Sequence, residues 1–157
     1  MSDADIVAAA TAECPGGVTL AVRVVRRAGE ESEAADVLLG IVGELDVSGD
    51  DGLLVTLSGV PVVELAQQVD RWLIGLRPDG PEFIYTSLSD PDEPGLLYFH
   101  AATPCWRVGS VLAAEDREIA TSLRTITAAA GEYVAAVERA VRPLGVDLPR
   151  FLRNPSR

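Results

Sequence analysis

The sequence contains no lysine, one histidine and two cysteines, and each scarcity excludes a class of chemistry. All 13 basic residues are arginine, so mechanisms that need a lysine amine, such as Schiff-base formation or a lysine-containing phosphate loop, are excluded. The single histidine, His100, leaves a histidine-based metal site without a second imidazole ligand. Glycine-rich phosphate loops, nucleophile elbows and zinc-protease motifs are also missing. We therefore expect no catalytic residues, no metal site and no cofactor.

The two cysteines, Cys14 and Cys105, are too few for a disulfide framework and lie in no Cys-x-x-Cys motif. This scarcity indicates a reducing compartment. Residues 1–5 are acidic, whereas a secretory signal peptide begins with basic residues. No apolar run approaches the roughly 20 residues of a membrane span. The sequence therefore predicts a cytoplasmic protein that does not enter a membrane.

Positive charge is also scarce, because 24 acidic residues outnumber 13 basic ones and leave a net charge of -11. Phosphate attraction needs a basic face, so the balance argues against a nucleic-acid binder. The acidic segments 30–33, 50–51 and 90–93 lack the spacing of a calcium-binding loop. We interpret them as solvated turns, and the alternative is that they steer a basic partner.

Hydrophobic periodicity predicts the order strand, strand, strand, helix, strand, strand, strand, helix. The predicted strands span residues 18–27, 37–47, 53–57, 82–88, 96–101 and 106–112, and the predicted helices span 62–76 and 116–141. Short connections favour antiparallel pairing. The expected fold is an α+β two-layer sandwich, in which a six-stranded, mostly antiparallel sheet carries both helices on one face.

The chain of 157 residues, with 48% apolar residues, suits one folded domain. We place that domain at residues 18–142. A loose tail, residues 1–17, precedes it, and an arginine-containing tail, residues 143–157, follows it.

Two helices cover only one face of the predicted sheet, and the other face is about half apolar. A solvated face should be mostly polar, so we predict that the open face binds a partner protein, preferably basic, or a second copy of the chain. The alternatives are that the tails fold over this face or that the alternation is misread in one strand. The candidate contact residues are Arg23, Val25, Val42, Glu44, Leu54, Tyr98, His100 and Arg107.

His100 and Cys105 are five residues apart across a predicted hairpin, so a thiol and an imidazole could lie close together. Such a pair could serve a small enzyme or a ligand-binding domain. A buried cysteine more often acts as a small apolar side chain, which favours a structural hairpin.

The element order resembles that of the small cytoplasmic immunity-type proteins of bacterial polymorphic toxin systems, nearest the Wap-type immunity family. The similarity covers residues 18–141 and rests on the layout together with Trp72-Leu73, residues 83–85 and residues 106–108. It implies a non-enzymatic inhibitor that covers a toxin domain. The order is also similar to that of class I secretion chaperones, which are acidic α+β dimers, although an N-terminal helix is lacking. The resemblances imply a protein-binding module of one kind or the other.

Overall fold

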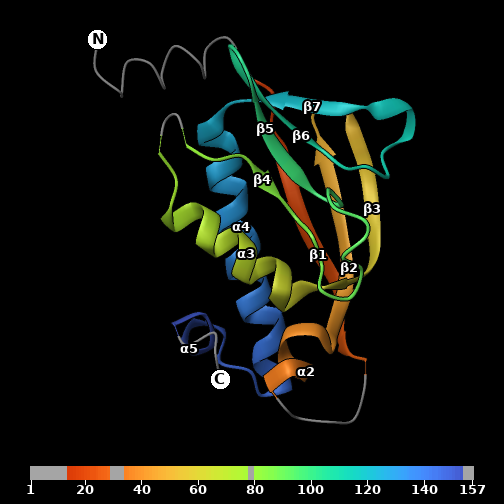
Figure 1. Ribbon diagram of the computed structural model, residues 1–157, viewed down its shortest axis with the longest axis vertical. Coiled ribbons are helices and arrows are strands. Elements are labelled where there is room, and N and C mark those ends of the chain that lie inside the picture. Colours follow the sequence, from red (N-terminus) through yellow and green to blue (C-terminus); the bar gives the residue numbers. More distant parts are fainter. Residues whose placement is uncertain (1–13, 29–33, 78–79, 154–157) are drawn as a thin grey trace.

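A computed structural model describes residues 14–28, 34–77 and 80–153 (Figure 1). The strands are β1 (Val18–Arg27), β2 (Ile41–Gly49), β3 (Gly52–Pro61), β4 (Phe83–Ile84), β5 (Tyr98–Ala102), β6 (Cys105–Gly109) and β7 (Glu118–Thr121). The α-helices are α2 (Ala34–Leu39), α3 (Val62–Ile74), α4 (Leu123–Val141) and α5 (Leu148–Arg153). None of these helices, within the residues described, combines the length and apolarity needed to cross a bilayer.

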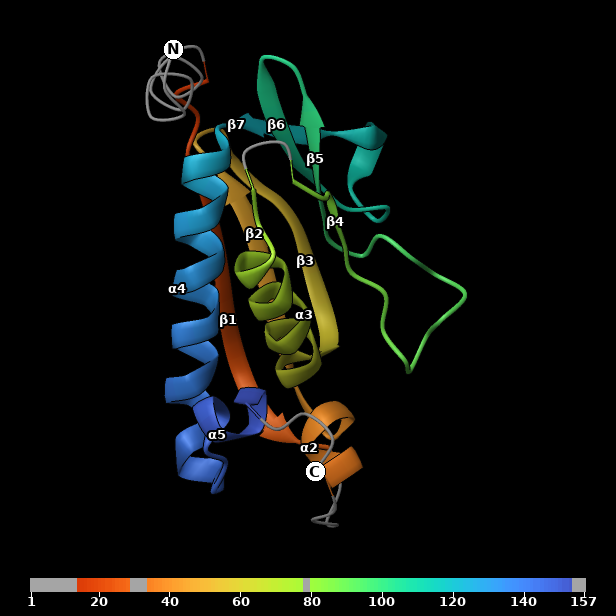
Figure 2. The same cartoon turned by 60° about the vertical axis from the view of Figure 1, so that its left-hand side comes forward.

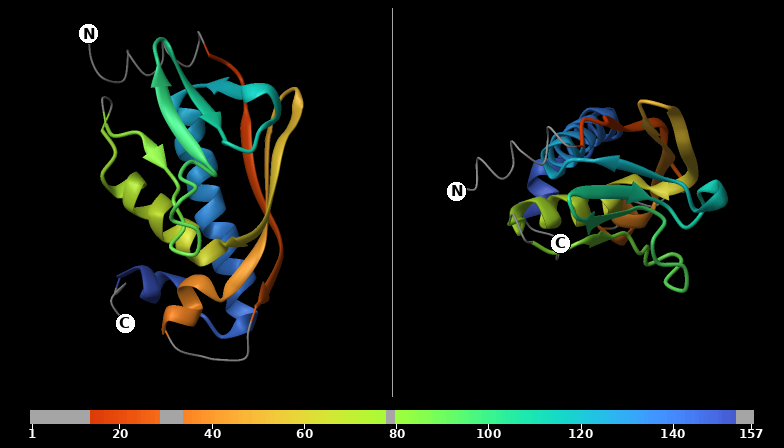
Figure 3. Two further views of the ribbon diagram at one scale, coloured as in Figure 1. Left: turned by 45° about the vertical axis from the view of Figure 1, so that its right-hand side comes forward. Right: turned by 90° about the horizontal axis from the view of Figure 1, so that it is seen from above.

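The strands form two antiparallel sheets, a first sheet in the order β1-β2-β3 and a second in the order β4-β5-β6-β7. The α+β class is therefore confirmed, whereas the single six-stranded sheet is wrong. Figures 2 and 3 show α4 beside β1, α3 over the first sheet, and the second sheet at the end of the molecule opposite α2 and α5.

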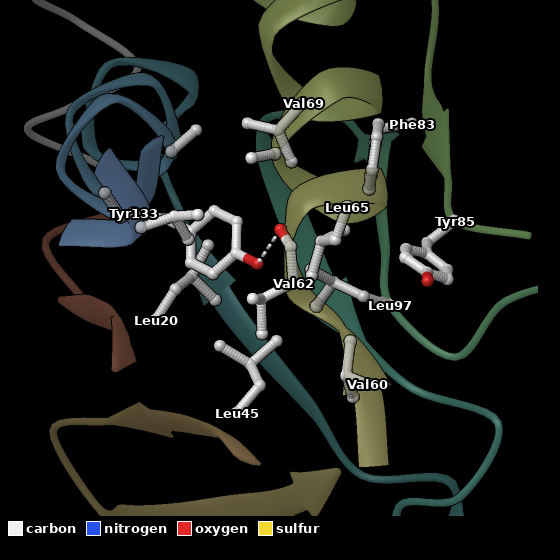
Figure 4. Packing of buried hydrophobic residues seen from close by; sticks show 14 of the residues in the cluster. Leu20, Leu45, Val60, Val62, Leu65, Val69, Phe83, Tyr85, Leu97 and Tyr133 are labelled. Atoms are coloured by element: carbon white, nitrogen blue, oxygen red, sulfur yellow. Dashed lines mark hydrogen bonds between the residues drawn. The ribbon is translucent and has the colours of Figure 1, made fainter. Parts of the chain in front are cut away.

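The position of α3 explains why the strands divide into two sheets. Residues 62–67 are all buried, so the first half of the helix needs cover on more than one side. Figure 4 shows Val62 and Leu65 of α3 between Leu45 of β2 and the pair Tyr85 and Leu97, which flank the second sheet's first two strands. The second sheet therefore covers α3 instead of extending the first sheet.

Polar contacts hold α3 to the second sheet. The buried carboxylate of Glu64 accepts a 2.6 Å hydrogen bond from the Tyr85 hydroxyl and a 2.9 Å bond from the backbone N–H of Leu88. The indole of Trp72 donates to the carbonyl of Pro81 at 2.8 Å. Its ring also packs against three aromatic rings of the second sheet, those of Phe83, Phe99 and Trp106.

The closing helix begins at Leu123 and not at Asp116. The hydroxyl of Ser122 caps it by accepting a hydrogen bond from the Thr125 N–H at 3.1 Å. The residues before the cap form β7, where Ile119 pairs with Val108 of β6. Pairing with a neighbouring strand thus prevails over the helical spacing that includes Ile119.

Other predicted boundaries also shift. Residues 37–39 belong to α2, so β2 begins only at Ile41. Strand pairing near residue 83 is limited to two residues, and β6 ends at Gly109.

The described residues nearest the two ends contact the domain more closely than predicted. Val146 and Leu148 are buried in the core, so described residues beyond 142 belong to the domain and are no tail. Near the other end, the carbonyl of Gly16 accepts a 2.5 Å hydrogen bond from the Thr121 hydroxyl. Residues 1–13 of the predicted N-terminal tail lie outside the described residues.

Cys14 and Cys105 form a disulfide bond, with their Cα atoms 5.8 Å apart. A reducing compartment predicts two free thiols, and this pairing contradicts that expectation. The cause is a non-local contact, because the cysteines are 91 residues apart in the chain.

Candidate functional site

The candidate site is the outer face of the second sheet, which we define by Tyr98, His100, Arg107 and Glu118. The register pairs His100 with Arg107, and it pairs Gly109 with both Tyr98 and Glu118. Directly paired residues of antiparallel strands share a face, so the four side chains lie on the same side of the sheet. All four are half-buried. Phe99, Trp106 and Val108, which alternate with them on β5 and β6, are buried in the core.

One carboxylate organises this face. The Tyr98 hydroxyl donates a 2.6 Å hydrogen bond to Glu118 Oε2, and His100 Nε2 lies 3.3 Å from the same oxygen. The rings of Tyr98 and His100 lie side by side, with centroids 5.3 Å apart. Partial burial and the neighbouring Glu118 carboxylate raise the pKa of Tyr98 to about 12, so the phenol remains a hydrogen-bond donor at neutral pH.

A glycine makes this arrangement possible. Gly109 is directly opposite Tyr98, and a Cβ atom there would collide with the Tyr98 hydroxyl and ring. Without that atom, the Tyr98 ring crosses β6 and its hydroxyl reaches Glu118 on the next strand. Sequence reasoning missed both Gly109 and Glu118, because it assigned Glu118 to the closing helix.

Exposed apolar side chains flank the four polar residues. Ile84, which pairs with Tyr98, is 58% exposed. Val111 is 52% exposed, and both it and Tyr98 lie against Gly95. Leu112, the next residue, is 53% exposed. Aromatic and arginine side chains beside exposed apolar residues are the composition that protein interfaces favour.

The outer face of the first sheet has a different character. Arg23 forms ion pairs with Glu44 and with Asp46, the latter at 2.8 Å. Thr56 donates a 2.7 Å hydrogen bond to Asp46. The hydrogen bond from Arg23 holds the pKa of the Asp46 carboxyl below its usual range. These groups satisfy one another, as on an ordinary solvated sheet face.

Of the predicted contact residues, Tyr98, His100 and Arg107 come together on the second sheet. Arg23, Val42 and Glu44 lie on the outer face of the first sheet. The remaining two, Val25 and Leu54, pack against the core instead.

Bulges in β1 and β3 cause Val25 and Leu54 to face the core. The register shifts between Arg23 and Arg26 in β1, and it shifts again beside Leu54 in β3. Each extra residue turns the following side chains to the opposite face. The outer face of the first sheet is therefore less apolar than the open face that we expected on a single six-stranded sheet.

While Cys105 is paired with Cys14, it has no free thiol to act as a cysteine–histidine nucleophile. Within the described part of the chain, no group of three or more histidine, cysteine or acidic residues is arranged to hold a metal ion.

Comparisons with known proteins are consistent with this absence of familiar motifs. No curated protein matches the chain, and no solved structure matches it. A family model described as a domain of unknown function, DUF7878, matches residues 22–143, which is most of the chain. The chain therefore belongs to the DUF7878 family.

Proposed function

We propose that this protein is a non-enzymatic protein-binding module and that the outer face of the second sheet is its contact surface. The observation that supports this best is that Ile84 and Val111, each more than half exposed, lie beside Tyr98. Exposed apolar side chains beside aromatic and arginine side chains are typical of interaction sites on proteins.

Charge favours a basic partner. The exposed carboxylate of Glu82 lies at the margin of the face, where it accepts a hydrogen bond from the Ala101 N–H. Asp116 lies near enough to Tyr98 to contribute to its raised pKa. With Glu118, these carboxylates outnumber Arg107 and Arg117, the arginines around the site, and the chain as a whole carries -11. Such a field accelerates the approach of a positively charged protein.

Capture from extracts of the native cell tests the proposal. Ile84→Arg removes an apolar contact and repels a basic partner, so we expect this variant to lose a basic protein that the unchanged chain retains. Ile74→Arg is the matched control, because Ile74 is 79% exposed on α3. With the purified partner, Ile84→Arg should weaken binding by at least about tenfold. Equal binding by both variants contradicts the proposal.

Val42→Arg tests the other predicted face. Val42 lies on the outer face of the first sheet, and we expect the substitution to leave binding unchanged. Loss of binding with Val42→Arg but not with Ile84→Arg would move the contact surface to the first sheet.

The type of partner is a further part of the proposal. An immunity-type role predicts that the captured protein is toxic when produced alone and harmless when this chain is produced with it. A chaperone-like role predicts a secreted cargo with no such toxicity.

We also place the protein in the cytoplasm, where Cys14 and Cys105 should be reduced. Thiol labelling in intact cells tests that placement, because a fully oxidised pair indicates an oxidising compartment.

A further inference from the structure

β3 is a long strand with a free edge. It spans ten residues and pairs only with β2 within the first sheet. Among the described residues, no backbone hydrogen bond outside that pairing involves residues 52–61. Figure 1 shows β3 along the margin of the molecule. A row of backbone N–H and C=O groups is therefore available to another strand.

Apart from its bulges, this edge lacks the protection that the β1 and β4 edges have. β3 contains no charged residue, and its Leu53 is 54% exposed. By contrast, β1 carries three arginines and lies beside α4, and β4 is only two residues long. Natural edge strands are usually short, charged or covered. Bulges in β3 leave Val55–Leu57 in regular register, so Thr56 is the centre of the segment that can pair.

We propose that two copies of this chain associate by antiparallel pairing of their β3 strands, centred near Thr56. The pairing is two-fold symmetric, so the same segment serves both copies and joins two three-stranded sheets into one of six strands. This surface is separate from the outer face of the second sheet and does not depend on the proposed function.

Charge decides between a second copy and a basic partner at this edge. Two copies, each with a net charge of -11, repel at most surfaces. The central segment Val55–Leu57 carries no charge, and Asp46, the carboxylate opposite Thr56 on β2, is bound to Arg23. Asp50 and Asp51 lie in the turn at the start of β3, away from this centre. The centre of the β3 edge is therefore where two copies meet with little repulsion, and it offers a basic strand no free carboxylate.

Analytical ultracentrifugation of the full chain over a range of concentrations tests the proposal. We expect the unchanged chain to reach twice its monomer mass as concentration rises. Thr56→Lys places two lysines opposite each other and should keep the chain monomeric. Thr56→Val is the matched control, because it removes the hydrogen bond to Asp46 without adding charge, and it should remain dimeric. Thermal melting confirms that each variant is folded.

Hydrogen exchange provides a test that needs no substitution. The amides of residues 55–57 that point away from β2 should exchange more slowly as the unchanged chain dimerises. A chain that stays monomeric at every concentration, or a folded Thr56→Lys variant that still dimerises, overturns the proposal. A dimer without added protection in β3 overturns it as well. Ile84→Arg should leave the dimer intact, which separates this surface from the partner site.

Discussion

Val24 is the residue whose backbone is most at odds with its side chain. It lies in the bulge of β1 with φ at +56°, in the left-handed region, and its side chain is 61% exposed. This conformation costs an L-residue about 1–2 kcal/mol, and a β-branched side chain rarely adopts it. A Cβ atom at the opposing Gly43 would lie 3.1 Å from the Arg23 carbonyl oxygen, which is closer than an ordinary contact. The bulge is therefore held by close packing, at the expense of Val24.

Val24→Gly should therefore stabilise the protein. Relief of the left-handed cost exceeds the entropy that glycine loses, so we expect the free energy of unfolding to rise by roughly 0.5–1 kcal/mol. Ala21→Gly, on the same strand but outside the bulge, should lower it by a similar amount. Urea denaturation measures both, and a destabilised Val24→Gly variant would show that the bulge does not strain this residue.

The tyrosines give a pH prediction at the same scale. Burial raises the pKa values of Tyr85, Tyr98 and Tyr133, that of Tyr98 to about 12. A phenol whose pKa is raised by folding stabilises the folded state fully below its unfolded pKa, near 10, and that contribution is lost as pH rises through the folded value. We expect no tyrosine of the folded chain to ionise near pH 10 in an ultraviolet titration. The chain has three tyrosines, so one of them accounts for one third of the absorbance change. If a third of the change occurred near pH 10, it would contradict the hydrogen bond between Tyr98 and Glu118.

At the scale of elements, α3 is the part that the sequence predicted best. The helical repeat of apolar residues from Val62 predicted both its start and its buried stripe. Val69 is fully buried on that stripe, so Val69→Asp should unfold the domain, because an unpaired buried carboxylate costs several kcal/mol. Ile74→Asp, at a position 79% exposed, should leave the melting temperature nearly unchanged. Circular dichroism during heating measures both variants.

The elements that were mispredicted depend on partners far away in the chain. Alternation identified β5 and β6, and therefore the shared face of Tyr98, His100 and Arg107. It could not indicate that α3 separates two sheets, because strand pairing is a non-local property. Ile119 fits a helical spacing, and only pairing with β6 shows that it belongs to a strand. Bulges defeat alternation in a similar way, since one extra residue reverses the face of Val25 or Leu54.

At the scale of the whole molecule, the bond between Cys14 and Cys105 closes a loop with a sequence separation of 91 residues. A loop of this length restricts the unfolded chain strongly, and the entropy model assigns such a link about 4.6 kcal/mol. We expect reduction to lower the free energy of unfolding by roughly 2–4 kcal/mol. Urea denaturation with and without a dithiol reductant measures the difference. A double Cys14→Ser, Cys105→Ser variant should be insensitive to the reductant, and equal stability of oxidised and reduced protein would contradict the link.

The same bond determines how the protein bears mechanical force. Tension applied between the two ends passes directly from Cys14 to Cys105 and continues into the rest of β6, β7 and α4. The bypassed segment contains the whole first sheet and α3, with an extended length of about 300 Å. That segment carries no tension along its backbone until the bond is reduced. In a single-molecule stretching experiment, reduction should therefore release about 300 Å of hidden length in addition to the extension of the oxidised chain.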